Sequence, residues 1–110
     1  MLDSPKSLKR IYTASENGFK ASRFHAACDD VPHTLVLIEN EFGKILGGYT
    51  PLTWNSGRGF IFDEPGLSFL FSVNELKKMT LKEEKRKKAI QCIPEYGPVF
   101  GSGADLAISD

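Results

Sequence analysis

Long apolar runs, an excess of charge of either sign and a framework of cysteines are all missing from this sequence. Its 110 residues hold 14 Lys and Arg against 14 Asp and Glu, so the formal net charge is zero. No apolar stretch approaches the roughly 18 residues that a membrane-spanning helix needs. The totals are those of one small globular domain. We therefore expect no nucleic-acid partner and no transmembrane segment.

Cysteine is scarce, with Cys28 and Cys92 alone. The first twenty residues carry basic side chains but no apolar stretch, so they do not have the pattern of a secretory signal. Without such a signal the default is two free thiols in a reducing compartment, and we expect a cytoplasmic location. Residues 1–10 are polar and are predicted to form a loose N-terminal lead-in.

Short apolar or alternating runs between turn residues predict a β-dominated α+β chain with antiparallel pairing. Residues 34–39 are apolar on both faces, which is typical of a buried central strand. Residues 40–43 predict a hairpin loop, and 44–50 a returning strand that Pro51 ends because it has no N–H to donate. The other predicted elements are strands at 69–73, 89–93 and 105–109, a brief strand at 60–62, a helix at 20–29, a poorer helix near 75–86 and a glycine-rich connection at 96–103.

The returning strand contains two adjacent glycines, Gly47 and Gly48. Glycine inside a strand costs backbone entropy and often marks a close approach of another group. Because the two glycines lie on opposite faces, both faces are hollowed. We expect large aromatic side chains, supplied by Phe69, Phe71 and Trp54, to fill the hollows.

A zinc site could be assembled from His25 and Cys28, which are one helical turn apart, together with His33 and Cys92. Because the sequence has no CxxC pair, a packed or capping role is favoured and we expect no metal. A reactive thiol needs an electropositive, partly exposed setting. Cys28 is the better candidate for one, because Cys92 shares a strand face with Ile90.

Two further site patterns are incomplete. Ser22 or Ser56 could join His25 and Asp29 in a hydrolytic site, but no nucleophile-elbow sequence surrounds either serine. The run GSGADL resembles part of a dinucleotide fingerprint, yet a strand follows it where a helix is required. We predict turns there and expect no cofactor.

A basic run follows the strand at 69–73. It is most simply a solvated, mobile connection, because it lacks the interleaved aromatics that stack on nucleic acid bases. An acidic protein partner or a membrane surface remains an alternative. The candidate contact residues are Lys77, Lys78, Lys82, Lys85, Arg86, Lys87 and Lys88.

Four short patterns occur in the order that a known family shows: FH..CD at 24–29, GGY....W at 47–54, FLFS at 69–72 and YGP.FG.G.DL at 96–106. Together they resemble a TLDc domain, over about residues 11 to 108. The residues that carry the resemblance as a structural motif are Phe24, Gly47, Gly48, Tyr49, Trp54, Phe69, Phe71, Tyr96, Gly97, Gly101, Gly103 and Asp105.

The resemblance implies a two-sheet antiparallel β-sandwich with short flanking helices over residues 11–110. TLDc domains continue beyond the last strand found here, so we expect this chain to lack C-terminal strands. A sandwich cut in this way should self-associate through an unpaired strand edge.

The resemblance also implies a function. TLDc proteins are linked to protection against oxidative damage and to binding of the V-type ATPase, so we expect a cytosolic interaction module without catalytic residues. One alternative is a small enzyme, either a hydrolase or a thiol-dependent antioxidant, that uses His25, Cys28 or Asp29. The other is a basic contact with a membrane or polymer through residues 77–88.

Overall fold

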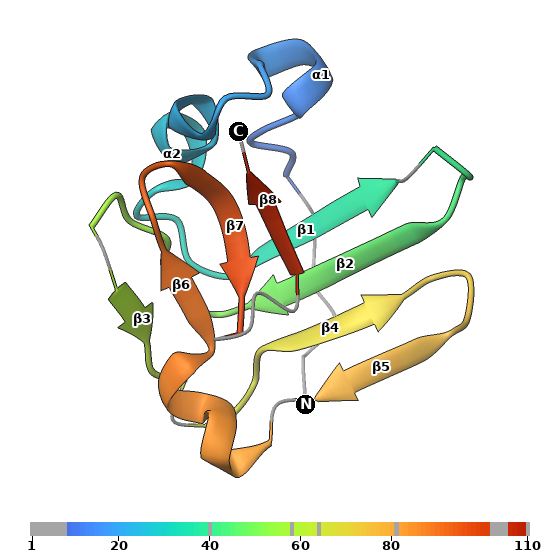
Figure 1. Ribbon diagram of the computed structural model, residues 1–110, viewed down its shortest axis with the longest axis vertical. Coiled ribbons are helices and arrows are strands. Elements are labelled where there is room, and N and C mark those ends of the chain that lie inside the picture. The colour runs from blue at the N-terminus through green and yellow to red at the C-terminus, as the bar shows by residue number, and fades with distance from the viewer. Residues whose placement is uncertain are drawn as a thin grey trace.

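The computed structural model describes residues 9–39, 41–57, 59–63, 65–80, 82–101 and 106–109. The strands of this part lie in two antiparallel sheets, with the orders β1-β2-β4-β5 and β3-β6-β7-β8 (Figure 1). The prediction of a β-dominated, two-sheet fold with short helices is confirmed. The first sheet holds β1 (Thr34–Glu39), β2 (Ile45–Thr50), β4 (Phe69–Ser72) and β5 (Lys77–Thr80), and the second holds β3 (Gly59–Ile61), β6 (Ile90–Cys92), β7 (Tyr96–Phe100) and β8 (Leu106–Ser109).

The predicted hairpin forms between β1 and β2, in a register that pairs Leu35 with Tyr49. Gly43 closes it at φ 78°, a left-handed conformation that glycine adopts without strain. The prediction that residues 34–39 form a buried central strand is wrong, because β1 is an edge strand and its Leu37 is 62% exposed. Apolar residues on both faces of a strand do not reveal how many neighbours it has, because pairing depends on the whole chain.

The basic segment does not form the helix predicted at 75–86, whereas the mobility expected of it stays a prediction. The chain turns at residues 73–76, where Leu76 has φ 54°, and β5 returns antiparallel to β4. A 3₁₀-helix, η1 (Glu83–Lys88), follows (Figure 1). Hydrogen bonding of β5 to β4 fixes this segment, and a charge-rich local pattern gives no sign of that pairing.

The prediction of a loop at 96–103 is also wrong for its first half. Residues 96–100 form β7, which lies between β6 and β8. Proline lacks an N–H and glycine weakens a strand, so the segment YGPVF reads as a connection. The register of β7 against β8 shifts between Tyr96 and Val99, and this irregularity accommodates Pro98 within the sheet.

Two short helices lie at one end of the sandwich, α1 (Ala14–Asn17) and α2 (Ala21–Cys28) (Figure 1). The helix predicted at 20–29 is confirmed by α2. Its buried residues are Ala21, Phe24, His25 and Cys28, which is the i, i+3, i+4, i+7 spacing of a single face. This face packs against β7.

The core lies between the sheets and beneath α2. Trp54 is fully buried and makes edge-to-face contacts with Phe24 and with Phe100, each with ring centroids 5.6 Å apart. Its indole Nε1 donates a hydrogen bond to Thr34 Oγ1 at 2.9 Å, which satisfies the polar end of the ring. The rest of the core cluster is formed by Cys28, Ile90 and Cys92.

Both hollows at the glycine pair are filled by aromatic side chains. A Cβ at Gly47 would collide with the ring of Phe71, on the outer face of the first sheet. On the inner face, a Cβ at Gly48 would lie 2.7 Å from Cζ of Phe100. Phe100 therefore occupies the inner hollow in place of Trp54, which packs edge-to-face against the Phe100 ring.

Some of the sequence predictions fall outside the described residues. Gly103 and Asp105 lie there, and so does most of the lead-in at 1–10. The domain limits and the expected lack of C-terminal strands stay predictions. In the part of the chain that was described, no helix has the length and apolar character required to cross a bilayer.

Candidate functional site

The polar cluster at the C-terminal end of α2 contains His25, which is 5% exposed. Its Nδ1 lies 2.6 Å from Oδ1 of Asp29, one turn further along the chain. Its Nε2 lies 2.9 Å from the carbonyl oxygen of Ile93 and 2.8 Å from that of Tyr96. Both ring nitrogens are thus engaged, and they join α2 to the turn between β6 and β7.

This geometry sets the charge on His25. A carbonyl oxygen only accepts hydrogen bonds, so Nε2 carries a proton. When Nδ1 also carries a proton it donates to the carboxylate of Asp29, so this arrangement favours the imidazolium form of the ring. Burial lowers the pKa of His25, but the hydrogen bonds to Asp29, Ile93 and Tyr96 outweigh it and raise the pKa above 6.5.

Ser56, one of the two serines considered for a hydrolytic site, is close to this cluster but in the wrong position. Ser56 Oγ donates a hydrogen bond to Oδ2 of Asp29, not to the imidazole. In a hydrolytic triad the histidine lies between the serine and the acid and accepts the serine proton. Here Asp29 lies in the middle and His25 has no nitrogen free to accept a proton. The arrangement links three segments of the chain and does not activate a nucleophile. Ser22 is exposed on α2.

The two cysteines are free, buried thiols. Burial, with a smaller contribution from the negative charge of Asp29, raises the pKa of Cys28 to about 11. Burial also raises the pKa of Cys92, against a smaller lowering by a backbone hydrogen bond from Asn55. Both thiols are therefore protonated at neutral pH, the opposite of what a thiolate nucleophile needs.

The residues considered for zinc do not converge. Within the described ranges, no three His, Cys, Asp or Glu side chains come together as metal ligands would. His33 contacts the hydroxyl of Tyr49 at 3.1 Å, away from the cluster at His25.

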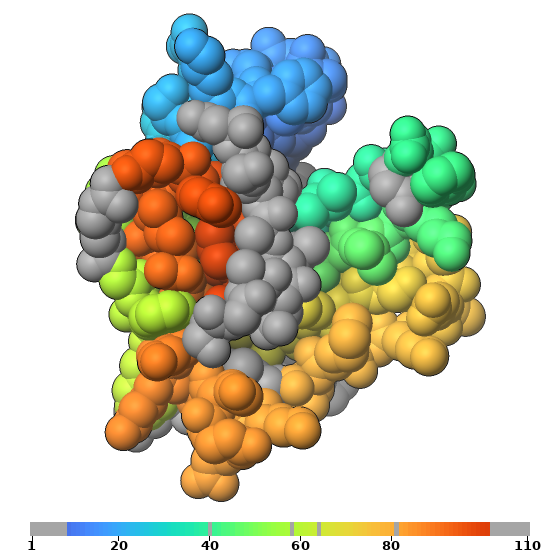
Figure 2. Space-filling view, viewed as in Figure 1, coloured from blue at the N-terminus to red at the C-terminus, as the bar shows by residue number. Residues whose placement is uncertain are grey.

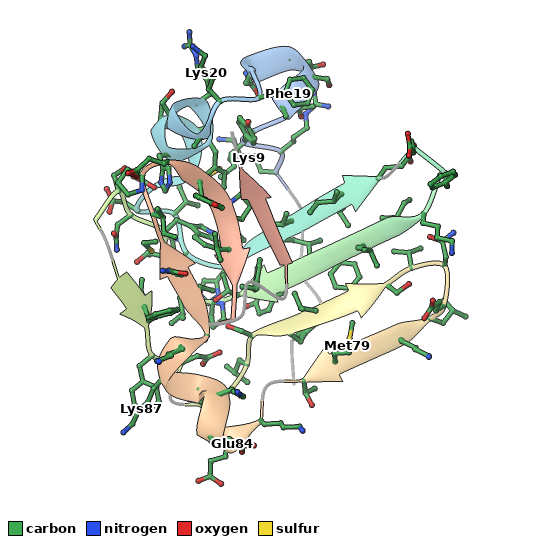
Figure 3. The ribbon with its side chains drawn as sticks, in the orientation of Figure 1. Lys9, Phe19, Lys20, Met79, Glu84 and Lys87 are labelled. Carbon is green, nitrogen blue, oxygen red and sulfur yellow. The ribbon has the colours of Figure 1, made fainter. Side chains whose placement is uncertain are left out.

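The basic residues form a second candidate region, the basic band, defined as residues 77, 78, 82 and 85–88. All of its side chains are exposed except that of Arg86, which is half-buried against Gly66. Figure 2 shows η1 projecting at one end of the molecule, and in Figure 3 Lys87 and Glu84 extend outward from it. Its exposed side chains come from η1 and from β5, where Lys77 and Lys78 lie on opposite faces of the strand.

Sequence reasoning missed the aromatic rings beneath this band. Nζ of Lys78 lies 4.4 Å from the centroid of the Phe69 ring, and Nζ of Lys88 lies 5.2 Å from that of Phe60. Such cation–π contacts hold a flexible ammonium group in place. The rings come from β4 and β3, so no local pattern in the basic run could have revealed them.

Asp63 was also missed. It is fully buried between β3 and β4, and its carboxylate accepts hydrogen bonds from the backbone N–H groups of Gly66 at 3.1 Å and Ser68 at 2.6 Å. Its own N–H donates to the carbonyl of Arg86 at 2.8 Å, which ties η1 to the loop. Aspartate is common in loops, and only complete burial distinguishes Asp63 from an ordinary loop residue.

A family model described as the TLDc domain matches residues 3–110. The chain belongs to the TLDc family. Comparison with curated proteins and with solved structures gave no significant match.

Two of the four TLDc-like patterns meet in space at the His25 cluster. FH..CD contributes His25 and Asp29, and YGP contributes the carbonyl of Tyr96. Gly97 is buried in β7, and Gly101 adopts φ 83° where its N–H donates to Ala89. In this TLDc domain the clustered polar residues connect helix to sheet.

Proposed function

We propose that this TLDc domain is a cytosolic protein-interaction module that protects against oxidative damage by binding the V-type ATPase. Family membership supports the first part, because TLDc domains are generally interaction modules. The link to the proton pump and to oxidative stress comes from the TLDc resemblance.

The observation that carries the proposal is the basic band. Residues 75–88 hold seven basic and three acidic side chains within a chain whose net charge is zero. An ordered concentration of one sign steers an oppositely charged partner and fixes its orientation. We propose that the band contacts an acidic surface of the pump, and that the neighbouring loop at residues 55–66 supplies further contacts.

The alternative of a small enzyme has less support. Ser56 is bonded to the acid and not to the imidazole, and His25 uses both nitrogens for structural contacts. The pKa of Cys28, raised to about 11, opposes thiolate chemistry. A binding role needs none of these groups to be reactive.

The test is capture of V-type ATPase subunits from a cell lysate by the full chain carrying a tag. Capture should weaken as the salt concentration rises, because the Debye length falls to about 8 Å at physiological ionic strength and below that in more salt. The double variant Lys85→Glu/Lys87→Glu should lose most of the captured pump.

The matched control is Lys9→Glu/Lys20→Glu, which changes the net charge by the same amount. Lys9 and Lys20 are exposed, and in Figure 3 they lie at the opposite end of the molecule from Lys87. Retention by the control and loss by the band variant would support the proposal. Equal loss by both would mean that only net charge matters, and absence of the pump at low salt would reject the partner.

A further inference from the structure

The edges of the two sheets differ in how well they are protected. An edge strand presents unpaired backbone groups, and proteins usually protect it by shortness, lysine or proline. Among the described strands the sheet edges are β1, β5, β3 and β8. β3 has three residues, β8 has four, and β5 has four that include Lys77 and Lys78. β1 has six residues, TLVLIE, without lysine or proline.

β1 also has apolar side chains in position for a neighbouring strand. Leu35 and Leu37 lie on the outer face of the sheet and are 42% and 62% exposed. Its single charged residue, Glu39, lies at the end of the strand. Figure 2 shows the β1–β2 hairpin projecting away from α1 and α2. Within the described residues, β2 is the only strand that pairs with β1.

We propose that β1 pairs antiparallel with β1 of a second copy of this chain, in a register centred on Val36. This inference is independent of the proposed function, because β1 is separate from the basic band. The interface joins two four-stranded sheets across a two-fold axis, so that one continuous sheet runs through both copies.

The pleat of the strand and the pairing of its side chains favour this register. A two-fold axis normal to the sheet keeps the outer face of both copies on one side, so opposed residues must share a face. Centring on Val36 places Leu35 opposite Leu37 of the second copy, an apolar pair on the outer face. Centring on Leu37 would instead oppose Leu35 to the carboxylate of Glu39.

In this register the two copies of β1 are complementary to each other, which favours a second copy of the chain as the partner of this edge. In the Val36 register Glu39 lies beyond the ladder, beside position 33 of the second copy, which is a histidine. No like charges oppose each other, and the central pairs are aliphatic. A second copy therefore satisfies both the backbone groups and the apolar side chains of the edge.

The first test is the mass in solution, measured by sedimentation over a concentration series. We expect particles of twice the chain mass of 12.2 kDa, and we expect Leu37→Lys to return them to single chains. Leu37 is largely exposed within one chain, so the variant should keep the far-UV spectrum of the folded parent, while its melting temperature should no longer depend on protein concentration. The matched control is Leu76→Lys, which removes an 89% exposed leucine from the β4–β5 turn and should leave the dimer intact.

The register is tested by mixing Leu35→Cys and Leu37→Cys chains under mild oxidation. Directly opposed Cβ atoms lie about 4.5–5.5 Å apart, within reach of a disulfide. A 35–37 cross-link in excess of 37–37 supports the proposal. Single chains at every concentration, a dimer that survives Leu37→Lys, or dissociation by Leu76→Lys would each overturn it. In the first case an extended segment of another protein would be the remaining occupant.

Discussion

The contact between Gly48 and Phe100 allows the cost of one added methyl group to be estimated. An alanine Cβ at position 48 would lie 2.7, 2.8 and 3.0 Å from Cζ, Cε1 and Cε2 of Phe100, whereas ordinary contacts begin at 3.4 Å. The ring is 3% exposed and meets the fully buried Trp54 edge-on, so it has little room to move.

Overpacking a core in this way costs about 1–3 kcal/mol. The smaller conformational freedom of an unfolded chain with alanine offsets about 0.4–1 kcal/mol of this. We therefore expect Gly48→Ala to lower the free energy of unfolding by about 1–2 kcal/mol. The melting temperature should fall by about 4–8 °C for each kcal/mol in a domain of this size.

A double-mutant cycle in urea isolates the contact. Phe100→Leu removes the ring tip that the new methyl group would meet. The double variant should be more stable than the sum of the two single losses by about 0.5–3 kcal/mol. Gly57→Ala is the surface control, because its Cβ would meet Oδ1 of the exposed Asn55 and no core atom, and it should cost less than Gly48→Ala.

The reasoning would be refuted by additive losses in the cycle, or by a Gly48→Ala protein that melts like the parent. Either result would mean that the space beside Gly48 is open to a ligand and is not filled by the Phe100 ring.

Buried polar groups give the remaining predictions. The native pKa of His25 is raised, so its contribution to stability is full below pH 6.5 and is lost as the pH rises through the native pKa. Melting temperatures should therefore fall as the pH rises above 6.5. His25→Gln should flatten this slope, whereas an unchanged slope would assign it to another group. Asp63→Ala should lower the free energy of unfolding, measured by urea titration, by about 2–4 kcal/mol, because the buried N–H groups of Gly66 and Ser68 lose their acceptor. Asp63→Asn should cost less, since its amide oxygen still accepts a hydrogen bond. Equal losses in the two variants would contradict the hydrogen-bond account. Cys28 should resist labelling by iodoacetamide at neutral pH until the chain is unfolded, because its thiol is buried and its pKa is raised to about 11. Mass spectrometry measures the labelling. Fast labelling of the native protein would favour the thiol-dependent alternative.

The elements that local pattern predicted well are those whose side chains repeat with one period. The helical spacing from Ala21 to Cys28 located α2, and the alternation of Phe69 and Phe71 with Leu70 and Ser72 located β4. The hairpin of β1 and β2 followed from two apolar runs around a turn. Periodicity is a property of a short stretch of sequence, so it can be recognised without knowledge of the fold.

The errors fell where pairing overrides local preference. Pro98 and Gly97 made β7 look like a loop, and the lysines of β5 made it look like a helix or a solvated connection. The edge position of β1 was invisible for the same reason, since the sequence of a strand does not count its neighbours. Hydrogen bonding by adjacent strands decided all three.

The features of the candidate site also fall into those that follow from local sequence and those that depend on the fold. Membership of the TLDc family, the two hollows at Gly47 and Gly48 and the charge of the basic band can be read from residue type and order along the chain. Folding was needed to show that Phe100 fills the inner hollow and that His25 bonds to carbonyls 68 and 71 residues away. Side-chain type and spacing are local properties of a chain, whereas the partner of a buried group depends on which distant segments the packed sheets bring beside it.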